Sequence, residues 1–267
     1  MKNTIYILTL IILLTSCSKE LTTPLDSEKI AVVESYLVAG DSTITVNVSK
    51  LLPFSTDTNE VKEYISGLQL QINGYDMEET STGIYQLKLK NACIQPGTTY
   101  QLKFRYYDDS VTSSTVIPEK PVNFALSETI LYTDRITSSS SGFGGGPMED
   151  IEVTWDNDDD SYYYLMVEYL ESTPDYINYL MEDLDLPENQ SEAPVQSAGA
   201  RIGMRNLNFF GHYRVVLFKV NKDFADLYQH LTSNSNNLTN PVTAITNGYG
   251  VFTGMSSDTA FIEVREN

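Results

Sequence analysis

The sequence predicts a mainly β protein with two antiparallel β-sandwich domains. The first is immunoglobulin- or transthyretin-like, and the second is fibronectin type III-like with helical insertions. Three observations indicate this class. Apolar residues recur at every second position in several separate runs, and turn-forming residues divide these runs. Tyrosine, which favours strands, occurs 18 times in 267 residues, against one tryptophan.

The N-terminus has the features of a secretory signal. Lys2 precedes an apolar run at residues 5–14, which is too short to cross a bilayer because a spanning helix needs about 20 residues. The sequence LTSC follows at residues 14–17. It resembles the bacterial lipobox, in which the cysteine thiol is joined to diacylglycerol and the chain is cut before the cysteine. We therefore expect residues 1–16 to be a lipoprotein signal peptide and Cys17 to be the lipidation site.

A short polar segment, residues 17–27, is predicted to tether the folded part to the membrane through lipidated Cys17. Its Ser18-Lys19-Glu20 is similar to the charged signals that direct lipoproteins to the cell surface in Bacteroidota, although those signals usually carry more acidic residues. We expect a lipid-anchored position at the outer membrane, with the cell surface favoured over the periplasmic face.

The first β-sandwich is predicted over residues 28–118. The turn sequences NGYD at 73–76 and QPGTT at 95–99 separate its strands, and the two prolines of VIPEKPV at 116–122 mark its end. The alternating runs lie at residues 44–48, 68–72, 85–89 and 100–106. Alternation in each run indicates sheets with one face in the core and one in water.

The second domain is predicted over residues 122–267. Residues 151–155 alternate as a strand, and the run at 161–171 returns as the second strand of a hairpin with the single tryptophan in the core. Helical spacing of apolar residues predicts one helix near 174–185 and another near 222–233.

The hairpin turn DNDDD contains a partial calcium pattern. Asp156, Asp158 and Asp160 occupy the first, third and fifth positions of a calcium loop. Ser161 replaces the expected glycine, and Val167 replaces the expected bidentate glutamate. A solvated hairpin turn is therefore the favoured interpretation, with a weak extracellular Ca²⁺ site as the alternative. We expect no other cofactor.

Catalytic motifs are absent from the sequence. The chain has two histidines, no HExxH, no CxxC and no GxSxG. The chain has a formal charge of −19 and shows no basic stripe of the kind that nucleic-acid binders have. We therefore expect it to bind no nucleic acid. Cys93 is read as a small buried hydrophobe. Abundant carboxylates leave an acid/base pair open.

Rigid aromatic side chains in loops are the expected contact surface because they give area at low entropy cost. One such residue is Phe143, in the Ser/Gly-rich loop TSSSSGFGGGPMED at 137–150. The others are Tyr176 and Tyr179, on one face of the helix predicted near 174–185.

The stretch from Asp226 to Gly254 contains a helix, Asn-Pro and the motif TNGYGVFTG. Together with VVESYLV at 32–38, GIYQLKL at 83–89 and GTTYQLKF at 97–104, it resembles a Bacteroidota outer-membrane lipoprotein family catalogued as domain of unknown function 4249. The family usually has a different glycine order than Asn247-Gly248-Tyr249-Gly250. The resemblance implies an outer-membrane lipoprotein, often encoded beside a TonB-dependent receptor, and implies no catalytic residues.

We therefore expect a non-enzymatic outer-membrane lipoprotein that is an accessory or ligand-binding partner of a TonB-dependent β-barrel transporter. One alternative is a structural or adhesion lipoprotein of the cell surface. Another is a glycan- or peptide-processing enzyme, which would need paired carboxylates in one pocket.

Overall fold

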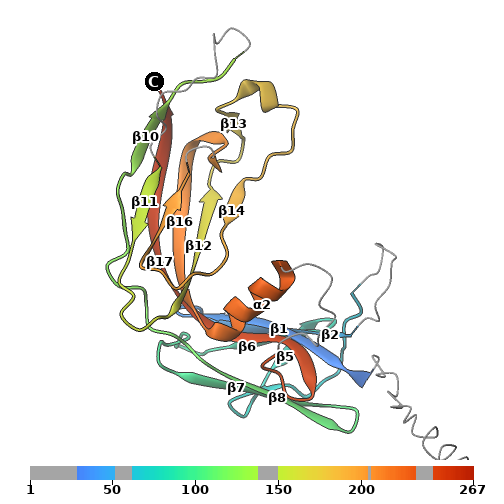
Figure 1. Ribbon diagram of the computed structural model, residues 1–267. Coiled ribbons are helices and arrows are strands. Elements are labelled where there is room, and N and C mark those ends of the chain that lie inside the picture. The colour runs from blue at the N-terminus through green and yellow to red at the C-terminus, as the bar shows by residue number, and fades with distance from the viewer. Residues whose placement is uncertain (1–28, 52–61, 138–149, 204–205, 233–242) are drawn as a thin grey trace, which may run out of the picture.

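A computed structural model describes residues 29–51, 62–137, 150–203, 206–232 and 243–267. The described chain is mainly β with several antiparallel sheets, which confirms the predicted fold class. Two β bodies form an L-shaped molecule (Figure 1). No helix among the described residues is long and apolar enough to cross a membrane. Cys17 and Phe143 lie outside these residues.

The first body is a β-sandwich built mainly from the N-terminal part of the chain. Its core contains Val33 and Val46 from one sheet and Phe104 from the other, each at most 2% exposed. One layer consists of β1 (Ala31–Val38), β2 (Thr43–Lys50), β5 (Glu78–Ser81) and β6 (Ile84–Lys88). The facing layer consists of β3 (Gln71–Ile72), β4 (Tyr75–Asp76), β7 (Thr99–Tyr106) and β8 (Asp109–Val116).

The second body is also a sandwich, with Trp155 3% exposed in its core as the sequence predicts. One layer consists of β10 (Ile130–Thr133), β12 (Tyr162–Tyr169), β13 (Asp175–Tyr176), β14 (Asn189–Ser191) and β16 (Phe209–Val220). The facing layer consists of β9 (Ala125–Leu126), β11 (Ile151–Thr154) and β15 (Gly199–Ile202). The alternating burial of β11 and β12 places their apolar side chains between the layers.

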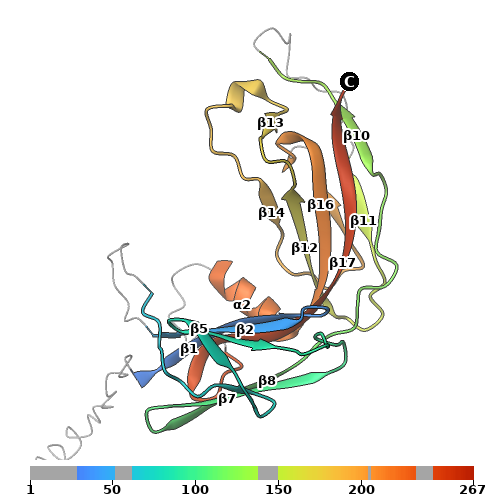
Figure 2. The same cartoon turned by 180° about the vertical axis from the view of Figure 1, so that it is seen from behind.

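The last strand, β17 (Gly248–Glu266), runs through both bodies (Figures 1 and 2). Its first half pairs in parallel with β1, and its second half pairs antiparallel with β16. Phe252 lies in the first core, and Ile262 lies in the second. Among the described residues, ten strands thus form one continuous sheet. The first half of β17, which falls within the predicted second domain at 122–267, thus belongs to the sheet and core of the first body.

The prediction of a helix near 174–185 is wrong. This segment contains β13 and a single 3₁₀ turn at Tyr179–Met181. Ile177 enters the second core at 5% exposure, and its N–H donates to the carbonyl of Asn208, so the chain runs extended beside β16 instead of coiling. The helix predicted near 222–233 corresponds to α2 (Lys222–Thr232).

Helix α2 lies in the angle between the two bodies (Figures 1 and 2). Its Phe224 packs edge-on against Tyr36 of β1 at 6.1 Å and against Tyr164 of β12 at 5.4 Å between ring centroids. The amide of Asn221, which precedes the helix, donates to Thr115 Oγ1 at 2.9 Å. Contacts to strands of both bodies stabilise the angle between them.

Candidate functional site

The candidate site lies at the free end of the second body, which we call the tip. The tip comprises residues 170–186 and the adjoining ends of β10, β16 and β17. It contains an open hollow of about 320 Å³. The hollow is lined by Tyr169, Glu171, Ser172, Thr173, Asp175, Phe210 and Gly211. Hydroxyl and carboxylate groups at its wall can hydrogen-bond a polar ligand.

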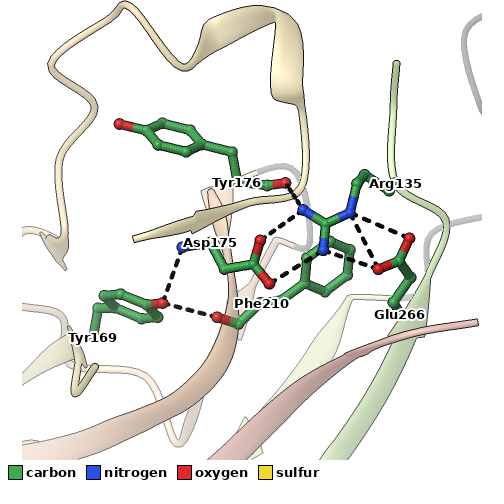
Figure 3. A network of polar contacts seen from close by, with 6 residues as sticks. All are labelled: Arg135, Tyr169, Asp175, Tyr176, Phe210 and Glu266. Carbon is green, nitrogen blue, oxygen red and sulfur yellow. Dashed lines mark hydrogen bonds and ion pairs between the residues drawn. The ribbon is translucent and has the colours of Figure 1, made fainter. Parts of the chain in front are cut away.

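Arg135 is the centre of a polar network (Figure 3) that includes Asp175 and Phe210, two residues that line the hollow. Its two terminal nitrogens donate to the carboxylate of Asp175 at 2.6 and 3.1 Å, and Nη2 donates to Glu266 at 2.9 Å. Nη1 also donates to the carbonyl of Tyr176 at 3.0 Å, and the guanidinium lies 4.6 Å from the ring centroid of Phe210. This bidentate and cation–π arrangement joins β13, β16 and β17 to the segment after β10.

Tyr169 lines the hollow and hydrogen-bonds two other lining residues, Asp175 and Phe210 (Figure 3). It is 6% exposed, and its hydroxyl donates to the carbonyl of Phe210 at 2.8 Å while accepting from the N–H of Asp175 at 3.4 Å. Its ring packs against Phe209 and Tyr213 at centroid distances of 4.9 and 5.0 Å. Burial raises the pKa of the Tyr169 hydroxyl, which therefore stays neutral. The hollow is thus preformed by buried contacts.

A hydrogen-bonded contact between Glu171 and His212 lies at the hollow, whose lining includes Glu171 and Gly211. Glu171 Oε1 lies 2.7 Å from His212 Nδ1 and accepts the backbone N–H of His212 at 3.2 Å. Gly211 permits this approach because its φ is +120°, and a Cβ there would lie 2.8 Å from Glu171 Cγ. Glu263 Oε1 is 3.9 Å from the other ring nitrogen of His212.

The electrostatics of the hollow favour ionised carboxylates. The hydrogen bond from Arg135 lowers the pKa of Asp175, and the hydrogen bond from His212 lowers the pKa of Glu171. Both groups are therefore charged acceptors at neutral pH. Such groups can bind hydroxyl or amine donors of a ligand, whereas a general acid needs a raised pKa.

Of the predicted contact residues, Tyr176 and Tyr179 lie within the described residues and differ in exposure. Tyr176 is half-buried, packs edge-on against Phe209 at 5.1 Å and supports the second core. Tyr179 lies on the 3₁₀ turn with 53% of its side chain exposed. The structure therefore leaves Tyr179, and not Tyr176, available at the tip surface.

The three aspartates of the partial calcium pattern are not brought together around one centre. The Asn157 amide organises this turn by accepting the N–H of Ser161 and donating to the carbonyl of Gln196. Asp156 accepts from Asn123 at 2.6 Å, and Asp160 has a left-handed φ of +52°. Within the described ranges, no group of three His, Cys, Asp or Glu side chains is placed to hold a metal ion.

Arg135 could not be recognised from the sequence because its partners are remote along the chain. Asp175 is 40 residues away and Glu266 is 131 residues away. No local motif surrounds this arginine in the sequence TDRIT. A fold prediction that paired β10 with β17 would have been needed to find the cluster.

We expect Arg135→Ala to lower the free energy of unfolding at pH 7 by about 1–2 kcal/mol, because a bidentate pair and a backbone hydrogen bond are lost together. The pKa of Asp175 is lowered in the folded chain, so its ion pair with Arg135 stabilises the fold fully above the ordinary pKa near 3.8. This stabilisation is lost as the pH falls through the lowered pKa. Urea unfolding at pH 7 and pH 3 should show the difference shrinking in acid. Arg201→Ala, which removes one 3.3 Å contact, is the control. A difference of the same size at both pH values would contradict this role.

Among solved structures, the titin immunoglobulin tandem domains A164-A165 match with 10% identity and a TM-score of 0.21, covering 90% of this chain and 97% of that chain. The first two immunoglobulin domains of DIP-gamma match with 8% identity and a TM-score of 0.19, covering 90% and 99%. Both TM-scores are below 0.5 and support no inference.

No curated protein matches the chain. A family model described as "Domain of unknown function (DUF4249)" matches residues 18–260. This range includes residues of both bodies and residues 170–186 of the tip, and it ends within β17. The resemblance predicted from the sequence motifs is therefore confirmed, and the chain belongs to the family of domain of unknown function 4249.

Proposed function

We propose that the chain is a lipid-anchored, non-enzymatic accessory protein of a TonB-dependent β-barrel transporter in the outer membrane, and that it binds the transporter or its ligand through the tip. The observation that carries the proposal is the preformed hollow at the tip, held by Arg135 and Tyr169. A rigid site of this kind lowers the entropy cost of binding.

The position of the tip within the molecule supports the proposal. Strand β1 begins at Ala31, shortly after the predicted tether at 17–27, and lies in the first body. The tip is at the far end of the second body (Figures 1 and 2). A chain anchored at Cys17 would therefore present the tip on a long arm, and β17 and α2 would keep this arm stiff.

The charge state of the hollow supports binding over catalysis. Asp175 and Glu171 are the carboxylates at its wall, and the pKa of each is lowered. A glycosidase pair needs one carboxyl group that stays protonated near neutral pH. An enzymatic role would thus need a different arrangement from the one in this hollow.

Isolation from native membranes tests the proposal. The chain should carry a short affinity tag in the exposed β7–β8 turn of the first body, because its C-terminus lies at the tip. It should be expressed at its natural level and extracted in a mild detergent. We expect a β-barrel membrane protein to co-purify in an amount comparable to the chain, and a tagged, unrelated lipoprotein serves as the control. Recovery of the chain without a β-barrel would contradict the transporter role and favour the structural or adhesion alternative.

A further inference from the structure

The outer surface of the tip carries four exposed apolar side chains in one short segment, which we call the tip ledge (residues 179–184). Tyr179 is 53% exposed, Leu180 62%, Met181 40% and Leu184 52%. Large apolar side chains that are exposed singly are normal, whereas a contiguous group at one protrusion is typical of an interaction site.

Backbone contacts hold the tip ledge in place. The side chain of Asn178 accepts the N–H of Leu180 at 3.1 Å, and the N–H of Leu184 donates to the carbonyl of Met181 at 2.9 Å. The N–H of Tyr179 donates to the carbonyl of Ile136 at 3.0 Å. The flanks are pinned by buried Ile177 and by Leu186, which packs against the second core. The four apolar groups are therefore displayed by an ordered turn.

The charged residues within the tip ledge and along the chain just after it have one sign. Glu182, Asp183, Asp185 and Glu188 are exposed, and no lysine or arginine occurs from residue 179 to residue 190. Glu182 raises the pKa of the Tyr179 hydroxyl. A complementary surface must therefore offer apolar contacts together with positive charge.

We infer that the tip ledge docks on a partner protein that presents an apolar groove rimmed by lysine or arginine. This inference deepens the proposed function by naming the contact surface and rests on it for the setting. An anionic bilayer would repel the four carboxylates. A second copy in a two-fold contact would place the same acidic rims against each other. A basic and apolar protein surface satisfies both features of the ledge.

Site-specific photocrosslinking in intact cells tests the inference. A photoreactive amino acid replaces Leu180 in the full-length chain, and the same replacement at Tyr75, which is 70% exposed in β4 of the first body, is the matched control. We expect one discrete protein adduct from position 180 and none from position 75. Mass spectrometry should locate the adduct on a partner peptide that carries lysine or arginine among apolar residues.

Charge reversal provides the second arm of the test. The triple variant Glu182→Lys/Asp183→Lys/Asp185→Lys should lower the adduct yield at position 180 at least tenfold. Its melting temperature should stay within a few degrees of that of the unchanged chain, since the three side chains are exposed. An undiminished yield in a folded variant would overturn the charge complementarity on which the inference depends.

The remaining outcomes are also decisive. No adduct, an adduct between two copies of this chain, or an adduct on an acidic peptide would overturn the inference. Binding of the purified soluble chain to vesicles of phosphatidylglycerol and phosphatidylethanolamine, lost in Leu180→Ser, would overturn it in favour of a lipid surface. An adduct on a basic and apolar surface of a protein that is not a β-barrel would support the inference and contradict the proposed function. Co-purification of a β-barrel without an adduct at position 180 would do the reverse.

Discussion

Replacing Gly250 with alanine is expected to prevent stable folding of the chain. Gly250 lies in the TNGYGVFTG motif at the start of β17, with a φ of +106°. A Cβ there would lie 1.9 Å from the carbonyl oxygen of Val33 in β1. That oxygen belongs to the backbone of a paired strand, so neither strand can move without breaking the parallel β1–β17 pairing. We expect a loss of more than about 4 kcal/mol in the free energy of unfolding.

Gly40→Ala separates this steric effect from backbone strain. Gly40 has a similar φ of +95°, but a Cβ there would meet no atom within 4 Å. We expect this control to cost about 1–2 kcal/mol, which is the strain of a left-handed residue alone. Urea unfolding followed by circular dichroism measures both variants. Equal losses of unfolding free energy in the two variants would contradict the steric clash between strands β1 and β17.

Replacing Cys17 with alanine is expected to move the chain from the membrane fraction to the soluble fraction almost completely. A thiol is needed for the thioether bond to diacylglycerol, and stable anchoring depends on the acyl chains. Fractionation of cells followed by immunoblotting measures the distribution, and mass spectrometry measures the lipid on residue 17.

Cys93→Ala is the matched control for this experiment. Cys93 is the other cysteine of the chain, is partly buried, and its Sγ accepts from the amide of Gln95 at 2.8 Å. This variant should remain with the membrane. A Cys17→Ala chain that still sediments with membranes would contradict lipid anchoring at this residue.

The fold class was predictable because alternation along a strand depends only on which face is buried. The burial of β7, which alternates exposed and buried at every position from Thr99 to Tyr106, follows the pattern read from its sequence. The partner of a strand was not predictable in the same way. Strand β1 pairs with β17 more than 200 residues later, and alternation contains no information about partners.

Local spacing also misled where the environment decided the structure. Ile177, Leu180 and Leu184 have helical spacing, which suggested one apolar helix face. In the structure Ile177 is buried, while the other two are exposed on the tip ledge. Tyr179, which the sequence placed on the face of that predicted helix, lies exposed on the 3₁₀ turn, and its contact role stays a prediction. The Arg135 cluster required the three-dimensional pairing of distant strands and could not be found from local motifs.

We propose that the tip is the end of the molecule that meets the transporter. The most direct measurement is an electron cryomicroscopy structure of the chain together with the β-barrel isolated from native membranes. We expect residues 170–186 to contact the barrel while the start of β1 faces the lipid-anchored end. A complex in which the first body makes the contacts and the tip stands free would contradict the claim.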